Sequence, residues 1–555
     1  MADRIELPGF GIGTRAVAGP VTRMAGPLPE PPPVASDRTP DAELAAARAA
    51  LAAVAGQLRA RAATLAGGTE AAEVLEAQAM MALDPALGAA VERAVAAGRT
   101  AARAIHEAFD GYLAALAAAG GRLAARVADL ADVRQRAIAA SLQVPVPSVP
   151  DPGHPYILVA HDLAPADTAV LDLGRVLGFV TAGGGPTSHT AVLARSRGIP
   201  AVVGCTGAER LTDGVTALVD PARSLVIGAP DPIEFPAELP AATSDGARTA
   251  ASAAFAGPGR TADGHPVALL ANLGDPAEAV AAAAAGAEGV GLLRTELLFL
   301  DAPAAPSWQR QRDAYRTVLA AFAGRRVVVR VLDAGADKPL PYLTGPPEPN
   351  PALGRRGVRA LRAAPHLLRP QLAAIAAAAA TEDAEVWVMA PMVAEPDEAA
   401  WFTAEAAAQG LLTAGVMIEV PSAVVLAEEI LAVTDFVSIG TNDLAQYALA
   451  ADRQLGGLGA LQDPWHPAVL RLVRLVGEAG ARAGKPVGVC GEAAADPLLA
   501  CVLVGLGAGS LSMAPAALAP VRAALAGRTL AQCRALADQV TAAGSAAAAR
   551  VAGLP

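Results

Sequence analysis

The amino-acid sequence predicts a multidomain α/β protein: an α/β domain with an all-helical insertion, followed by a (β/α)8 TIM barrel. Three observations support this fold class. At 555 residues the chain is too long for a single hydrophobic core. Residues 41–143 are rich in Ala, Leu, Arg and Glu with helical spacing and few helix breakers. From residue 265 onward, short apolar runs mostly alternate with Ala-rich helical segments, and their number matches a (β/α)8 barrel.

The boundaries between these parts follow changes in composition. Short β-branched runs separated by Gly- and Pro-containing turns predict a compact α/β unit over residues 156–228. In the helical stretch, Asp84-Pro85 and Gly120-Gly121 predict turns between antiparallel helices. A Pro-, Ala- and Ser-rich stretch after residue 228 predicts a linker. The expected domains are an α/β domain (1–37 and 144–228), a helical insertion (38–143), a linker or hinge (229–264) and a barrel (265–555).

Composition and charge argue against several classes of function. The net charge of −11 disfavours nucleic acid as the main partner. The four cysteines show no CxxC spacing, so we expect neither a disulfide framework nor a zinc site. The amino terminus has no apolar signal segment, and the uncharged run 497–521 is interrupted by Gly, Ser and Pro, so we expect no membrane insertion. These features predict a cytoplasmic protein.

Polar residues gather at one end of the predicted barrel. The eight apolar runs are 267–273, 289–294, 326–333, 386–393, 415–420, 436–440, 486–492 and 507–513. Because the parallel strands of such a barrel all end at one mouth, polar residues at their carboxyl ends should lie together there. The polar residues at or just past these ends are Asn272, Arg294, Arg330, Glu419, Asn442, Asp443, Cys490 and Glu492. We expect the active site at this mouth.

A second candidate site is the segment GFVTAGGGPTSHTAVLARSRGIPAVVG, residues 178–204. Three glycines and a proline come shortly before His189 and a helical pattern follows it, so we expect His189 at a helix amino terminus. Backbone N–H groups and the helix dipole there favour a group that becomes anionic, as a phosphorylated imidazole does. The structural alternative is a turn histidine that caps the helix. The whole string, however, closely resembles the phosphohistidine signature of phosphoenolpyruvate-utilising enzymes.

Phosphoenolpyruvate carries a phosphate and a carboxylate, so a pocket for it needs cations with fork geometry. Arginines occur in the motifs GVGLLRTELLFL (289–300), VVVRVLDAGADKPLPY (327–342), NPALGRRGVR (350–359) and TNDLAQYALAADR (441–453). The candidate arginines are Arg294, Arg330, Arg356 and Arg453. An arginine is usually a solvated surface charge. Arg294 and Arg330, however, stand at the ends of apolar runs, where a charged side chain suggests a functional role.

Two further groups at the mouth suggest chemistry. Glu419 and Asp443 are hard oxygen donors at the ends of successive strands, and they fit Mg²⁺, which proteins bind through a few carboxylates plus substrate oxygens. The alternative is a buried ion pair with one of the arginines. Cys490 has the usual interpretation of a buried structural thiol. At a barrel mouth it could instead protonate the enolate that remains when phosphoenolpyruvate loses its phosphoryl group.

In this order, the motifs resemble enzyme I of the phosphoenolpyruvate-dependent sugar phosphotransferase system over almost the whole chain. The helical segments EAQAMMALDP (76–85) and ADVRQRAIA (131–139) are similar to the family's insertion that binds the carrier protein HPr. The resemblance implies that phosphoenolpyruvate phosphorylates His189 with Mg²⁺ present, and that HPr then receives the phosphoryl group. It also implies a homodimer formed through the barrel. The implied site residues are Arg294, Arg330, Arg453, Asn442 and Asp443 for substrate, Glu419 and Asp443 for the metal, and Cys490 as proton donor.

Two other readings remain open. A pyruvate phosphate dikinase or phosphoenolpyruvate synthase has similar motifs, but the residues before the histidine segment are mostly helical and contain no Gly-rich nucleotide loop. A non-catalytic regulatory phosphoprotein would usually have lost some site residues, whereas every matched position here carries suitable chemistry. Because His189 must reach the barrel mouth and then leave it, we also expect a large swivel about residues 229–264.

Overall fold

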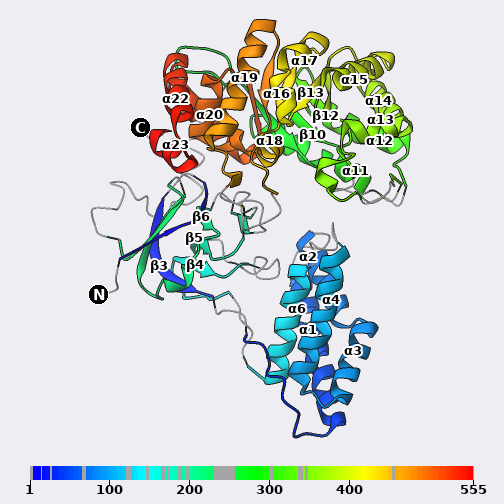
Figure 1. Cartoon of the computed structure of the whole chain (residues 1–555), viewed down its shortest axis with the longest axis vertical. Coiled ribbons are helices and arrows are strands. Elements are labelled where there is room, and N and C mark those ends of the chain that lie inside the picture. Colours follow the sequence, from blue (N-terminus) through cyan, green and yellow to red (C-terminus); the bar gives the residue numbers. More distant parts are fainter. Residues whose placement is uncertain are drawn as a thin grey trace. The chain divides into compact units, whose positions relative to one another are not determined.

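The chain forms two compact units, Met1–Leu239 and Pro240–Pro555 (Figure 1). Among the helices that the structure describes, none is both long and apolar enough to cross a bilayer. The computed structural model describes residues 4–13, 16–24, 28–64, 70–119, 127–144, 149–163, 171, 174–184, 190–191, 193–194, 199–221, 223–230, 257–300, 304–335, 340, 342–343, 348–452, 458 and 461–553.

One part of the first unit is a helical bundle, drawn in blue to cyan in Figure 1. Its core is built from alanines and larger apolar residues such as Val54, Ile105 and Phe109, all of them almost completely buried. Small side chains at many core positions let the helices approach closely. The bundle helices are α1 (Pro40–Thr64), α2 (Glu70–Ala82), α3 (Pro85–Ala96), α4 (Ala101–Ala119) and α6 (Val127–Leu142).

The turn predicted at Asp84-Pro85 is confirmed. Asp84 caps α3: its carboxylate accepts hydrogen bonds from the N–H groups of Ala86 at 2.8 Å and Leu87 at 3.3 Å. Pro85 occupies the first helical position, where no N–H is needed. The turn predicted at Gly120-Gly121 lies outside the described residues.

The strands of the first unit form one eight-stranded sheet in the order β1-β8-β7-β3-β4-β5-β6-β2. Along β4, alternate side chains enter two different cores, so both faces of the sheet are covered. The strands β3 and β4 are parallel neighbours, although the whole bundle separates them in sequence. The bundle is therefore an insertion, as predicted. The strands are β1 (Ile5–Pro8), β2 (Phe10–Ile12), β3 (Val17–Arg23), β4 (Tyr156–Ala160), β5 (Val176–Thr181), β6 (Ala201–Val203), β7 (Thr216–Asp220) and β8 (Leu225–Gly228).

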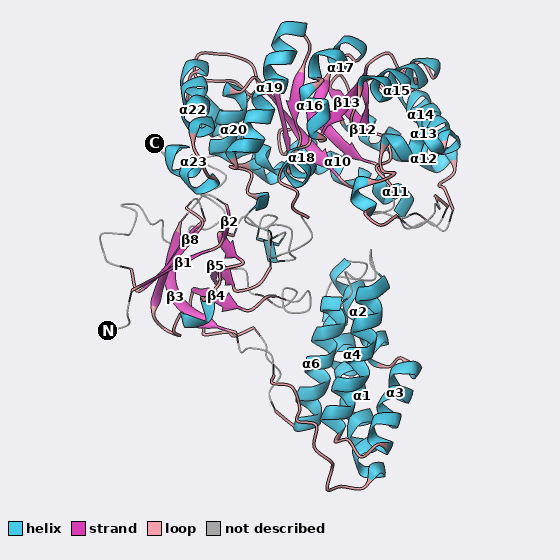
Figure 2. Cartoon of the chain, viewed as in Figure 1, coloured by secondary structure: helices cyan, strands magenta, loops and turns pink. Residues whose placement is uncertain are grey.

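The second unit is a closed barrel of parallel strands, shown in magenta among cyan helices in Figure 2. All eight predicted runs contain a strand, which confirms the barrel prediction. The strands are β9 (Ala268–Leu273), β10 (Val290–Arg294), β11 (Arg326–Arg330), β12 (Glu385–Val393), β13 (Ala414–Ile418), β14 (Val437–Ile439), β15 (Val487–Val489) and β16 (Ser510–Met513).

The barrel strands are buried on both sides, as expected for strands covered by helices. Inside the barrel, Leu292, Val328, Met389 and Met417 form an apolar cluster, so the barrel interior is filled by side chains. The helices of this unit are α10 (Ala279–Ala284), α11 (Glu296–Leu300), α12 (Trp308–Ala321), α13 (Val358–Ala363), α14 (Pro365–Ala379), α15 (Pro396–Ala408), α16 (Pro421–Val425), α17 (Ala427–Val433), α18 (Thr441–Ala448), α19 (Pro467–Ala483), α20 (Pro497–Gly505), α21 (Leu518–Ala526), α22 (Leu530–Ala542) and α23 (Ala546–Gly553).

Candidate active site at the barrel mouth

Several predicted site residues lie at the carboxyl ends of the barrel strands. Arg294 and Arg330 are the last residues of β10 and β11. Glu419 and Cys490 directly follow β13 and β15, and Asp443 lies in the first turn of α18, just after β14. Because all the barrel strands are parallel, these residues share one mouth. His189 and Arg453 lie outside the described residues, so their predicted roles stay predictions.

Arg330 is buried and already paired at this mouth. Its Nη2 donates to Oε1 of Glu296 at 2.7 Å and lies 3.6 Å from Oδ2 of Asp333. Burial alone would lower the pKa of Arg330, but the carboxylates of Glu296, Asp333 and Glu419 outweigh it and raise the pKa above its ordinary value. Arg330 is therefore a permanent positive charge in a region with little water.

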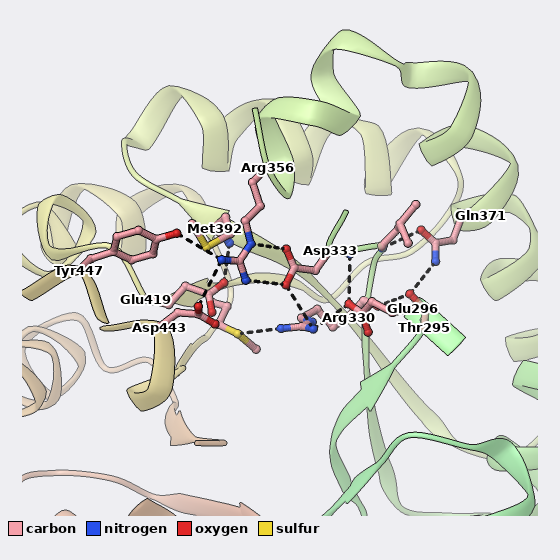
Figure 3. A network of polar contacts seen from close by, with 12 residues as sticks. Thr295, Glu296, Arg330, Asp333, Arg356, Gln371, Met392, Glu419, Asp443 and Tyr447 are labelled. Atoms are coloured by element: carbon pink, nitrogen blue, oxygen red, sulfur yellow. Dashed lines mark hydrogen bonds and ion pairs between the residues drawn. The ribbon is translucent and has the colours of Figure 1, made fainter. Parts of the chain in front are cut away.

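Arg356 reaches the same cluster from the loop that precedes α13, and only 2% of its surface is exposed. Nε and Nη2 donate to the two carboxylate oxygens of Asp333 at 3.3 and 3.2 Å, which is a fork arrangement. Nη1 donates to Oδ1 of Asp443 and to the hydroxyl of Tyr447, both at 3.2 Å. Figure 3 shows this guanidinium between the two carboxylates.

Glu419 is buried among other acids. Its Oε1 accepts a hydrogen bond of 2.7 Å from the backbone N–H of Met392, which has a positive φ of 58°. A non-glycine residue at such a φ is strained, and strain of this kind concentrates at functional sites. Burial, and then the negative charges of Asp443 and Asp333, raise the pKa of Glu419 to about 8, although Arg330 opposes this.

Cys490 lies at the mouth with a protonated thiol. Its Sγ–H donates to the carbonyl of Ile439 at 3.6 Å, and only 3% of the residue is exposed. Burial raises the pKa of Cys490 to about 11, so the thiol keeps its proton at neutral pH. Asn272 holds the neighbouring backbone, because its Nδ2 donates to the carbonyls of Cys490 at 3.0 Å and Ser512 at 3.2 Å.

The predicted site residues differ in how many hydrogen bonds and ion pairs they make within the protein. Arg294 is exposed and makes no hydrogen bond or ion pair with another residue in the described part of the chain. Asn442 is half-buried, and its Oδ1 accepts a hydrogen bond from the N–H of Glu492 at 3.1 Å. Arg294 is thus a cation that remains available to an anionic ligand, whereas Arg330 and Arg356 are held in place by carboxylates.

The sequence prediction missed four residues that organise this site: Glu296, Asp333, Gln371 and Tyr447. A signal existed for two of them, because Glu296 and Asp333 are acids that follow the predicted arginines by two and three residues. Gln371 is a fully buried amide in an apolar helix, and its Nε2 donates to the hydroxyls of Thr295 and Tyr315. No sequence pattern indicated Tyr447.

The mouth as a whole is a compact set of buried charges with an acidic excess. Such a set suits two ligands of opposite sign: an anion that the guanidiniums bind and a cation that the surplus carboxylates bind. The buried acids are Glu296, Asp333, Glu419 and Asp443, and the buried bases are Arg330 and Arg356.

Comparison with known proteins agrees with this chemistry. Three models of phosphoenolpyruvate-utilising enzymes match consecutive parts of the chain: the N-terminal domain at residues 7–126, the mobile domain at 152–224 and the phosphoenolpyruvate-binding domain at 250–530. A phosphoenolpyruvate-protein phosphotransferase of Streptomyces coelicolor is 54% identical over 551 residues, which is 98% of each chain. Proteins of the same name from Haloferax volcanii and Bacillus subtilis are 39% and 40% identical, over 97% and 72% of each chain.

The fold, the barrel mouth and the three domain matches define a phosphoenolpyruvate-utilising enzyme. The chain belongs to the phosphoenolpyruvate-protein phosphotransferase family. The predicted resemblance and the predicted enzyme class are therefore confirmed.

Proposed function

We propose that the protein transfers the phosphoryl group of phosphoenolpyruvate to its own His189 and then to a histidine of the carrier protein HPr. Pyruvate is released, and the reaction is the first step of sugar uptake by the phosphotransferase system. The proposal rests on the barrel mouth of a chain of this family, where buried Arg356 contacts Asp443 and buried Arg330 lies beside Asp333.

The substrate contacts follow from charge and geometry. Phosphoenolpyruvate presents a phosphate and a carboxylate, and guanidinium groups bind both with paired hydrogen bonds. Arg330 and Arg356 supply guanidiniums that carboxylates already orient, and Arg294 supplies an exposed one at the end of β10. Arg453 and Asn442 complete the proposed set of contacts.

The acidic side chains at the mouth fit Mg²⁺. Burial and the nearby negative charges of Asp443 and Asp333 raise the pKa of Glu419 to about 8. A divalent cation bound there would offset the repulsion between these carboxylates. Within the described residues, no group of three His, Cys, Asp or Glu side chains forms a complete metal site. Glu419 and Asp443 would therefore hold the ion together with substrate oxygens. When bound, the ion neutralises phosphate charge during transfer.

The chain's own residues account for the remaining steps. The bond between phosphorus and the enol oxygen breaks as a bond forms between phosphorus and an imidazole nitrogen of His189. The enolate that remains takes a proton at its methylene carbon from the thiol of Cys490 and becomes pyruvate. A pKa of about 11 leaves Cys490 protonated before this step. Water then returns a proton to the thiolate.

Delivery to HPr requires His189 to leave the barrel mouth. We propose a swivel about residues 229–264, of which 231–256 lie outside the described residues. The helical insertion, residues 38–143, is the proposed HPr-binding part, and the barrel, residues 265–555, is the proposed dimer contact. This role implies a cytoplasmic location, because both phosphoenolpyruvate and HPr are in the cytoplasm.

The decisive experiment is labelling with ³²P-phosphoenolpyruvate and Mg²⁺, comparing wild type with His189→Ala. We expect an acid-labile, alkali-stable label on wild type that the variant lacks, and its passage to added HPr. Label that does not pass to HPr would favour a paralogue that feeds another acceptor, such as a dikinase-like enzyme. A folded wild type that takes no label would favour a non-catalytic regulatory phosphoprotein.

A further inference from the structure

Asp333 is the point where the two buried arginines of the mouth meet. It follows β11 by three residues and is completely buried. Its Oδ1 accepts from Nε of Arg356 at 3.3 Å, and its Oδ2 accepts from Nη2 of Arg356 at 3.2 Å. Oδ2 also lies 3.6 Å from Nη2 of Arg330. One carboxylate therefore lies between two guanidiniums, as Figure 3 shows.

The segment that carries Asp333 is itself held in place. The backbone N–H of Asp333 donates to Oε1 of Glu296 at 3.1 Å, and the same oxygen accepts from Arg330 at 2.7 Å. The preceding N–H, of Leu332, donates to Oε1 of Gln371 at 3.0 Å. Because both N–H groups are bonded to buried side chains, the carboxylate of Asp333 starts from a defined backbone position.

Arg330 keeps one N–H donor that no group among the described residues uses and that an anionic ligand could accept. The buried Nε–H of Arg330 has no hydrogen-bond partner in the described part of the chain. A buried donor without a partner is unfavourable unless a ligand satisfies it. The contacts of Arg330 to Glu296 and Asp333 both use Nη2, so its Nε–H remains for an anion.

We propose that Asp333 is a positioning residue for the anionic substrate: it holds the guanidiniums of Arg330 and Arg356 in the orientation that binds phosphoenolpyruvate. This inference rests on the proposed function, in which both arginines contact that substrate. An arginine side chain in one fixed orientation loses less conformational freedom on binding, so the carboxylate increases affinity without touching the substrate.

The competing explanation is that Asp333 only balances the positive charges of Arg330 and Arg356. Two substitutions of Asp333 distinguish this role from positioning. Asp333→Asn keeps the shape of the side chain but removes the charge that holds the guanidiniums. Asp333→Glu keeps the charge but moves the carboxylate by one methylene. Positioning requires both variants to weaken phosphoenolpyruvate binding, whereas charge balance requires only Asp333→Asn to do so.

The experiment measures the KM for phosphoenolpyruvate and the maximal rate of phosphoryl transfer in the full chain, together with the dissociation constant for phosphoenolpyruvate by calorimetry. We expect both variants to raise the KM and the dissociation constant by about tenfold to a hundredfold. The matched control is Glu405→Gln, which removes the carboxylate that holds Arg369 in an exposed fork between α14 and α15. That control should change the KM by less than about twofold.

A coupling test adds a readout that a merely structural role would not change. Asp333→Asn combined with Arg356→Lys should raise the KM by less than the product of the two single effects, because one of the two guanidiniums that Asp333 orients is already gone. Fully additive effects would overturn the proposal.

The remaining outcomes are equally definite. A wild-type KM and dissociation constant in Asp333→Glu, or in both variants, would overturn the positioning role. The proposed function would still stand in that case, provided that the wild-type protein binds phosphoenolpyruvate. If Asp333→Asn does not fold, Asp333→Glu decides alone, since it keeps the buried negative charge. A wild type that does not bind phosphoenolpyruvate would overturn the proposed function and this inference together.

Discussion

Nη1 of Arg356 lies 3.2 Å from Oδ1 of Asp443, so the mouth pairs a predicted substrate contact directly with a predicted metal ligand. The two residues are 87 positions apart in the chain. Any cation that binds Asp443 must share that carboxylate with a guanidinium. Metal binding and a buried ion pair are the two alternatives that the sequence predicts for Asp443, and in the structure Asp443 forms the ion pair with Arg356.

Arg356→Lys tests whether fork geometry matters at this position. A lysine keeps the positive charge but cannot donate to both oxygens of Asp333 and to Asp443 at once. We expect the KM for phosphoenolpyruvate to rise by about tenfold to a hundredfold, measured by label transfer to the protein. The control is Arg369→Lys, which breaks an exposed fork with Glu405 and should leave the KM unchanged. Equal effects of the two substitutions would contradict a specific role for Arg356.

Glu419→Gln separates stability from metal binding. The folded pKa of Glu419, about 8, lies above the ordinary value of 4.5, so folding favours its protonated form. The stability that this provides is complete below pH 4.5 and is lost as the pH rises through about 8. With a metal chelator present to keep the site free of cations, the melting temperature of wild type should therefore fall more steeply between pH 6 and pH 9 than that of Glu419→Gln.

The same variant should bind a divalent cation more weakly, because an amide replaces a carboxylate ligand. Binding of Mn²⁺ as a paramagnetic substitute for Mg²⁺ measures this directly, without relying on activity. Parallel melting curves for wild type and variant would contradict the buried, neutral state of Glu419. Unchanged Mn²⁺ affinity would remove Glu419 from the proposed metal ligands.

Cys490→Ala tests the proposed proton donor. The variant should still bind phosphoenolpyruvate, but pyruvate formation should slow by about 10²- to 10⁴-fold, the usual contribution of a general acid. Rapid-quench measurement of pyruvate release provides the rate. The matched control is Cys205→Ala, because Cys205 is also a buried thiol whose pKa burial raises to about 12, but it lies in a hydrophobic core of the first unit. A full rate in Cys490→Ala would leave only the structural interpretation of this thiol.

Gly491→Ala tests the close packing of the mouth. A Cβ at Gly491 would lie 1.9 Å from Oγ1 and 2.7 Å from the backbone nitrogen of Thr441, which begins α18. The helix that carries Asp443 would have to move, so we expect a loss of about 1–3 kcal/mol in the free energy of unfolding and a higher KM for phosphoenolpyruvate. Chemical denaturation and label transfer measure the two effects. Gly509→Ala, whose Cβ would meet only one atom at 3.9 Å, should change neither.

The sequence determined the barrel and the identity of several residues at its mouth. Each strand is a short apolar run bounded by Gly, Pro or polar residues, and such local patterns survive in the printed sequence without any tertiary information. Parallel strands all end on one side, so the position of Arg294, Arg330, Glu419 and Cys490 followed from the strand predictions alone.

Only the tertiary structure decided which of these residues pair and which residues hold them. Asp333 contacts Arg356 across 23 positions, and Glu419 meets the backbone of Met392 across 27. Such contacts depend on how the strands and their loops close around the barrel, and no periodic pattern in the sequence records that closure. The raised pKa of Glu419 likewise arises only when folding buries it beside Asp443 and Asp333, because a charge shift depends on distance and desolvation rather than on residue type.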